Sequence, residues 1–126
     1  MEGRQSLNEL ARIEAELREG RFLLRIVGEV DISNAHALAE AIENAVPNDT
    51  TTVLVDLAQT TYLDSAGVQL LIQLSERLKA RRHELRVVVP EGAPVRAVLE
   101  LAGLAKVIPL ESPRDAGDQA GSLGVP

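Results

Sequence analysis

The chain has 126 residues with a formal net charge of −6, 2% aromatic residues and no cysteine. Its length suits one domain around a single core, and the lack of cysteine excludes disulfides and thiolate metal sites. Net negative charge and scarce aromatic rings argue against nucleic-acid binding. No apolar run approaches the roughly 20 residues that span a bilayer. The first ten residues lack the basic segment followed by an apolar segment that is typical of a signal peptide. We therefore expect a soluble, cytoplasmic protein that binds neither nucleic acid nor membrane.

The first part of the chain predicts a hairpin. Residues 1–10 show no clear period, so we expect a mobile lead-in or a short helix there. Residues 12–17 and 22–27 alternate apolar and polar side chains on either side of a turn that contains Gly20. Two such runs joined by a short turn are typical of an antiparallel hairpin.

The middle of the chain predicts helix, strand and helix in turn. Ser33 is a good N-cap for an amphipathic helix over residues 35–46. Residues 53–55 are continuously apolar and β-branched or leucine, as expected of a strand covered on both faces. A helical period begins after Ser65, with an apolar stripe that runs from Val68 to Leu78.

The last part predicts a strand, a helix and a short final strand. Residues 85–89 form another apolar run, and a helix follows from Pro94 to a left-handed stop at Gly103. We expect a strand over residues 106–110, at a sheet edge because it contains a proline, and a disordered tail over residues 111–126.

These elements predict an α/β domain over residues 11–110. Its mixed β-sheet opens with an antiparallel hairpin and continues with alternating helices and strands, whose crossovers make the later strands parallel. Asp31, Asp56 and Asp64 then fall at or after strand ends, where sheets of this kind place their ligand-binding loops.

Ser65 is the strongest candidate for a chemical role in the sequence. It stands where a helix begins, facing backbone N–H groups without helical partners and the positive end of the helix dipole. A plain helix cap suits that position, and so does a serine that carries a phosphoryl group. A hydrolase nucleophile is disfavoured, because there is no Gly-x-Ser-x-Gly elbow and only His36 and His83 could act as the base.

Other binding functions have weaker support. The carboxylates at strand ends could bind Mg²⁺ or accept a phosphoryl group, but a solvated acidic rim explains them as well. The basic run Lys79 to His83 is accounted for by the dipole of the preceding helix. Neither phosphate-binding glycine motif occurs, so nucleotide binding has weak support and stays open. We expect no cofactor, no metal site and no catalytic residues.

Four segments resemble one protein family. They are Gly28-Glu29-Val30-Asp31, the strand around Val53–Leu57, Leu63-Asp64-Ser65-Ala66-Gly67-Val68, and Val95 to Leu104. In this order they are similar to STAS domains, and the closest subgroup is the bacterial anti-sigma factor antagonists. The resemblance runs from about Ile13 to Leu110, which is nearly the whole expected fold.

The resemblance implies a phosphorylation switch. It makes Ser65 the acceptor of a phosphoryl group from a partner that is both an ATP-binding serine kinase and an anti-sigma factor, and a phosphatase would reverse the reaction. Ala66 stands where many members carry a second hydroxyl, so one acceptor is expected. The resemblance and the strand-end positions together give the expected partner-binding residues Asp31, Ser33, Asn34, Asp64, Ser65, Gly67 and Gln69.

The resemblance leaves the exact role open. The unphosphorylated protein would bind the kinase and release its sigma factor, as a monomer or weak homodimer. Related domains also build stressosome-type scaffolds and regulate transport systems, and both remain alternatives.

Overall fold

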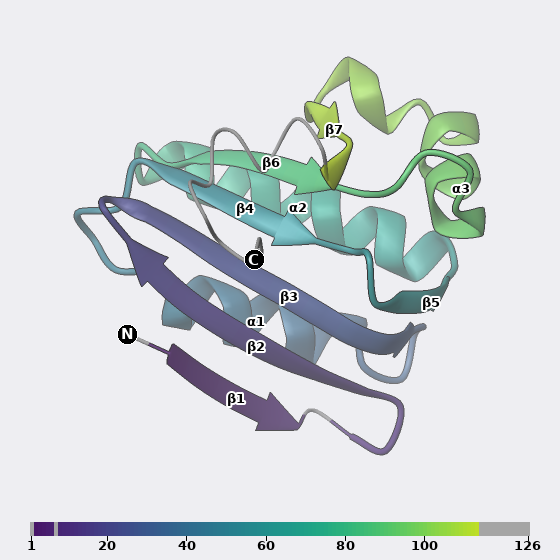
Figure 1. The fold of residues 1–126 in the computed structure, drawn as a ribbon, viewed down its shortest axis with the longest axis horizontal. Coiled ribbons are helices and arrows are strands. Elements are labelled where there is room, and N and C mark those ends of the chain that lie inside the picture. The colour runs from purple at the N-terminus through teal and green to yellow at the C-terminus, as the bar shows by residue number, and fades with distance from the viewer. Residues whose placement is uncertain (1, 7, 114–126) are drawn as a thin grey trace.

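The structure is a computed structural model that describes residues 2–6 and 8–113, and the statements below concern those residues. Strands and helices follow one another as Figure 1 shows. The strands are β1 (Glu2–Ser6), β2 (Ala11–Arg18), β3 (Arg21–Val30), β4 (Thr52–Asp56), β5 (Thr60–Leu63), β6 (Glu84–Val88) and β7 (Leu110–Glu111). The helices are α1 (Ala35–Ala45), α2 (Ser65–Ala80), α3 (Pro94–Leu101) and the 3-10 helix η1 (Leu104–Lys106).

The strands form one mixed sheet, which confirms the α/β class. The main path is β1-β2-β3-β4-β6-β7, and β5 pairs with β3. Strands β1, β2 and β3 pair antiparallel, so the opening hairpin is confirmed. All later pairs are parallel. Val30 at the end of β3 lies opposite Leu63 at the end of β5, so the loops after these strands leave one edge of the sheet together.

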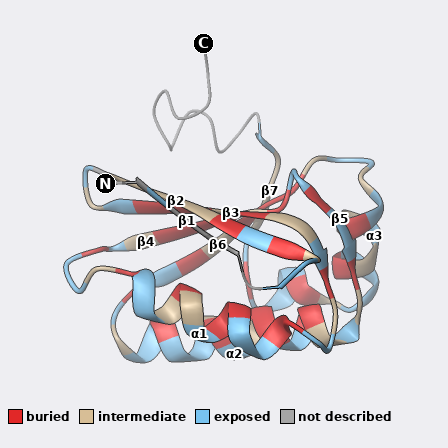
Figure 2. Ribbon diagram, turned by 90° about the horizontal axis from the view of Figure 1, so that it is seen from below, coloured by how far each residue is buried: buried red, intermediate tan, exposed pale blue. Residues whose placement is uncertain are grey.

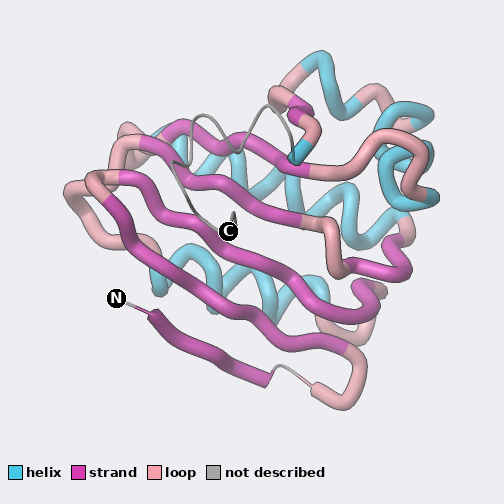
Figure 3. Tube along the Cα trace, viewed as in Figure 1, coloured by secondary structure: helices cyan, strands magenta, loops and turns pink. Residues whose placement is uncertain are grey.

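The molecule has a helical layer on one face of the sheet. Helices α1 and α2 lie side by side on that face, and α3 packs near β5 at one end (Figures 1 and 3). Their buried sides meet the inward residues of the strands, including Leu24, Val55 and Val87, to form the main core. The apolar stripe expected from Val68 to Leu78 is buried, as the helical period predicts.

The other face of the sheet differs from the expectation for residues 53–55. Figure 2 shows no helix on that face in the described part of the chain. Leu54 is nevertheless buried there, in a small cluster with Leu23 and Val88. Charged side chains on the same strands form ion pairs, such as Arg25 with Asp56 at 3.3 Å, so charged residues line this face instead of a second helical layer.

Two strands were not predicted from the sequence. Residues 2–6 form β1, an edge strand paired with β2, so the expectation of a mobile lead-in or a short helix is wrong there. Thr60–Leu63 forms β5, between the strand and the helix that were predicted for the middle of the chain. Its pairing to β3 begins across an irregularity between Gly28 and Glu29.

The end of the chain is also arranged differently. In place of the expected strand over 106–110, the structure has a 3-10 turn followed by the two-residue β7. Pro109 has no N–H to donate to a neighbouring strand, and only its carbonyl oxygen forms a bond, which it accepts from the Val87 N–H at 3.0 Å. Glu111 belongs to β7 and lies 3.0 Å from the Arg86 guanidinium, so the tail does not begin at residue 111 as expected. The rest of the expected tail, from residue 114, lies outside the described residues.

Candidate functional site

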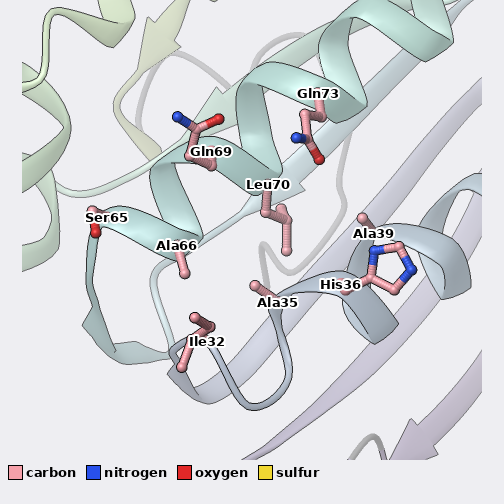
Figure 4. Close-up of a pocket in the computed structure, with 9 residues that line it drawn as sticks. All are labelled: Ile32, Ala35, His36, Ala39, Ser65, Ala66, Gln69, Leu70 and Gln73. Atoms are coloured by element: carbon pink, nitrogen blue, oxygen red, sulfur yellow. The ribbon is translucent and has the colours of Figure 1, made fainter.

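A groove between α1 and α2 brings together the two segments that the sequence singles out. It encloses about 340 Å³, and Figure 4 shows the side chains around it. Ile32 and Ala35 come from the loop and helix after β3, and Ser65, Ala66 and Leu70 come from the start of α2. His36, Ala39, Gln69 and Gln73 complete the lining. The floor is therefore apolar, and polar side chains stand at its rim.

The start of α2 is capped by Asp64. Its carboxylate accepts hydrogen bonds from the backbone N–H groups of Ala66 at 2.9 Å and Gly67 at 3.4 Å. The sequence interpretation of Ser65 as the cap is therefore wrong, because Ser65 is the first residue inside the helix. Its side chain is exposed, and its hydroxyl has no hydrogen-bond partner within the described part of the chain. The cap holds the backbone while the neighbouring hydroxyl points to solvent.

Gly67 sets how closely α2 approaches β5. A Cβ atom at this position would lie 2.4 Å from Cγ of Leu63, well inside van der Waals contact. Gly67 is buried, and its contact with a partner stays a prediction. It supports the site by letting the first turn of α2 pack against β5, the strand that ends just before Asp64.

The loop after β3 is fixed by Asp31. Its Oδ1 accepts bonds from the Ser33 hydroxyl at 2.5 Å and from the Ser33 backbone N–H at 2.8 Å. These two bonds, the hydroxyl first, hold the pKa of the Asp31 carboxyl below its ordinary value, and a small burial effect opposes them. Ser33 therefore closes a turn instead of capping α1, which corrects its predicted role as N-cap.

Asn34 holds the same loop from beneath. It is only 1% exposed; its Oδ1 accepts from the Asp31 backbone N–H at 3.0 Å, and its Nδ2 donates to the Glu29 carbonyl at 2.8 Å. Its Nδ2 also lies 3.3 Å from Oδ1 of Asn8, in the turn between β1 and β2. Asn34 thus braces the loop from a buried position, and the partner-binding role expected for it stays a prediction. Asn8 was not singled out from the sequence, although asparagine is a favoured turn residue.

Gly28 lies near the end of β3 and permits a close approach of two backbone segments. Its φ is +113°, and a Cβ there would lie 2.0 Å from the carbonyl oxygen of Leu10. Any side chain would therefore both strain the backbone and displace the β1–β2 turn. The adjacent Glu29 N–H donates to that same carbonyl at 2.9 Å, which ties the loop to the turn.

The most exposed apolar side chain in the groove is Ile32, at 87%. It follows Asp31 directly and lines the same groove as Ser65, and Gln69 on the rim is also exposed. The predicted meeting of the Asp31 loop and the Ser65 helix at one sheet edge is therefore found in the geometry. Asp56 is not part of this site, since it pairs with Arg25 on the helix-free face.

No arrangement for nucleophilic catalysis or metal binding is found in the described residues. His36 lies 3.2 Å from the Glu40 carboxylate and stands at the far end of the groove from Ser65 in Figure 4. His83 is buried elsewhere, 2.5 Å from the Thr50 carbonyl. Within residues 2–6 and 8–113, no three His, Cys, Asp or Glu side chains gather as metal ligands, and no helix is long and apolar enough to cross a membrane.

Comparison with known proteins agrees with this geometry. A model of the STAS domain matches residues 12–116. The anti-sigma-F factor antagonist RsfB of Mycobacterium tuberculosis is 34% identical over 93 residues, which are 74% of this chain and 75% of that protein. Among solved structures, an anti-sigma factor antagonist from Mycobacterium paratuberculosis matches with a TM-score of 0.70 and 29% identity over 84% of this chain and 89% of that one. The antagonist SpoIIAA in its unphosphorylated form has a similar fold (TM-score 0.67, 22% identity, 90% of this chain and 98% of that one).

Proposed function

The chain belongs to the STAS domain family, and from that premise we propose that it is an anti-sigma factor antagonist switched by phosphorylation of Ser65. The unphosphorylated protein binds a serine-kinase anti-sigma factor and thereby releases the sigma factor. The names of its relatives support the antagonist function. The observation that carries the switch is the Ser65 hydroxyl, which is exposed and unpartnered on the rim of the α1–α2 groove.

The groove supplies a docking surface of suitable chemistry. Ile32 is an exposed apolar side chain that a partner can desolvate, and exposed Gln69 and Gln73 offer hydrogen bonds around it. Buried apolar anchors within a polar rim are typical of protein interfaces. The proposed contact surface is therefore Asp31 to Ser33, Asp64, Ser65, Gln69 and Gln73, and it omits the buried Asn34 and Gly67.

Phosphorylation would change this surface by charge. A phosphate adds about −1.5 to −2 charges at neutral pH. The N–H groups of Ala66 and Gly67, which could otherwise receive it, are already bonded to the Asp64 carboxylate. The phosphate thus meets a like charge at Asp64 and remains turned toward the partner. Partner release then follows from repulsion and desolvation cost at the rim, with the fold retained.

The proposed switch needs a kinase and a phosphatase as partners. The kinase binds the ATP and catalyses the transfer, so this chain needs no cofactor and performs no catalysis itself. A phosphatase restores the unphosphorylated form, and the protein works in the cytoplasm as a monomer or weak homodimer.

The test is phosphorylation of the purified protein by its cognate kinase with Mg-ATP. We expect one phosphate, located on Ser65 by mass spectrometry, and none in Ser65→Ala. The control Ser75→Ala should be phosphorylated like the unaltered protein. A phosphate on Thr60, Thr61 or Ser75 would contradict the proposal, as would co-purification with a transporter or a megadalton scaffold and no kinase.

A further inference from the structure

A second groove lies at the opposite end of α2 from Ser65. Lys79 on its wall is 14 residues along the helix from Ser65, which is about 21 Å at 1.5 Å per residue. The groove encloses about 400 Å³, within the range of about 300–1,000 Å³ of small-molecule sites. Its lining residues are Thr51, Ser75, Lys79, Arg82, His83, Glu84, Leu85, Val107 and Pro109.

Two cations on this groove have no ion-pair partner in the described part of the chain. Lys79 and Arg82 are both exposed, and no described carboxylate pairs with either. The negative end of α2 is satisfied locally, because the Leu78 carbonyl accepts from Arg81 and His83 and the Lys79 carbonyl accepts from Arg82. The cations are therefore available to a ligand.

His83 also lines this groove and carries a buried nitrogen without a hydrogen-bond partner within residues 2–6 and 8–113. It is only 3% exposed although it lines this groove, and its Nδ1 lies 2.5 Å from the Thr50 carbonyl oxygen. A carbonyl can only accept, so Nδ1 donates to it. Nε2 is buried and has no partner among the described residues. A buried polar atom without a hydrogen-bond partner destabilises the protein, and a ligand that bonds to it removes that cost.

The rest of the lining defines the body of the ligand. Val107 is 63% exposed, and with Pro109 and Leu85 it gives the groove an apolar wall. Glu84 is the one carboxylate on the lining, and it lies 2.9 Å from the Arg86 guanidinium, so its charge is partly balanced.

We propose that this groove binds a small organic phosphate monoester. The phosphate oxygens accept hydrogen bonds from Lys79 and Arg82, and the ligand supplies the hydrogen-bond partner that Nε2 of His83 lacks among the described residues. A phosphate monoester carries about −1.5 to −2 charges at neutral pH, which match the two cations, whereas a carboxylate carries only one. The organic part packs on Val107 and Pro109.

The test is titration of the full chain with glycerol 3-phosphate, inorganic phosphate and glycerol, followed by calorimetry and by the ¹⁵N signals of the His83 ring. We expect glycerol 3-phosphate to bind at least tenfold more tightly than glycerol and to shift the Nε2 signal. Inorganic phosphate should bind more weakly, because it makes no contact with Val107 and Pro109, and equal affinity would overturn the assignment to an organic monoester. No saturable binding, or binding without a His83 shift, would overturn the proposal.

Two variants keep the test clear of folding effects. Arg82 has a φ of +67°, a conformation that glycine adopts readily, so Arg82→Gly removes the guanidinium without backbone strain. Lys79→Gln removes the other cation from an exposed helix position. Each should weaken glycerol 3-phosphate binding at least fivefold. The matched control is Lys106→Gln, at the other lysine of the chain, which is exposed and off the groove. An equal loss in the control would show non-specific charge attraction and overturn the site.

Discussion

The carboxylate of Asp64 accepts a 2.9 Å hydrogen bond from the backbone N–H of Ala66, and this bond assigns different tasks to two adjacent residues. Asp64 stabilises the first turn of α2, and the Ser65 hydroxyl is left exposed, as the proposed phosphorylation requires. We expect Asp64→Ala to lower the free energy of unfolding by about 1 kcal/mol, the usual value of an N-cap. Ser65→Ala should change it by less than about 0.5 kcal/mol, as is usual for surface substitutions.

Urea unfolding of the two variants measures this difference. Asp64→Asn is the control, because an asparagine oxygen caps a helix as well as a carboxylate does, and it should recover most of the loss. If Ser65→Ala cost as much as Asp64→Ala, the serine would share the cap and the separation of tasks would be wrong.

The sequence could predict the central sheet but not its additions. Residues 53–55 and the hairpin are defined by local apolar patterns, which the structure retains as β4, β2 and β3. Strand β5 has only four residues, and its pairing depends on the irregularity beside Gly28. Strand β1 carries no distinct alternation and is held by its partner β2. Strands β1 and β5 both depend on pairing with a neighbouring strand, so no local sequence pattern could predict them.

The site shows the same division. The approach of the Asp31 loop to Ser65 follows from parallel strands that end together, and it could be inferred from topology. Which of Asp64 and Ser65 caps α2 could not be inferred from the sequence, because the two residues are adjacent and both residue types are good caps. The brace between Asn34 and Asn8 joins residues 26 apart, so it is visible only in three dimensions.

Gly67→Ala should destabilise the protein through one contact. The added Cβ would lie 2.4 Å from Cγ of Leu63, so the first turn of α2 must move away from β5. Overpacking of this kind typically costs about 1–3 kcal/mol. Chemical unfolding should show a loss in that range, and Gly3→Ala, where no atom lies within 4 Å of the new Cβ, should change little. A stabilised Gly67→Ala would mean that α2 has room to shift.

The Asp31–Ser33 turn predicts a pH effect. NMR titration should find the pKa of the Asp31 carboxyl below its ordinary value, and Ser33→Ala should raise it because the hydroxyl bond is the main cause. A carboxyl whose pKa falls on folding stabilises the folded form above its ordinary pKa, and this contribution disappears as the pH falls through the lowered value. Ser33→Ala should therefore lose stability at neutral pH and little at strongly acidic pH. An unchanged Asp31 pKa in this variant would contradict the assigned cause.

The proposed docking surface is tested by two exposed apolar residues. Ile32 is 87% exposed on the α1–α2 groove, and Leu101 is 90% exposed at the end of α3, away from the groove lining. Ile32→Glu should keep the free energy of unfolding, since the side chain is already in water. It should weaken binding of the unphosphorylated protein to the kinase at least tenfold, which is about 1.4 kcal/mol, because an acidic side chain replaces an apolar contact beside Ser65. Leu101→Glu makes the same change in charge and should leave the dissociation constant unaltered. Calorimetric titration of both variants decides between surfaces: a larger loss in Leu101→Glu would move the partner to α3, and unchanged affinity in both would remove it from the groove.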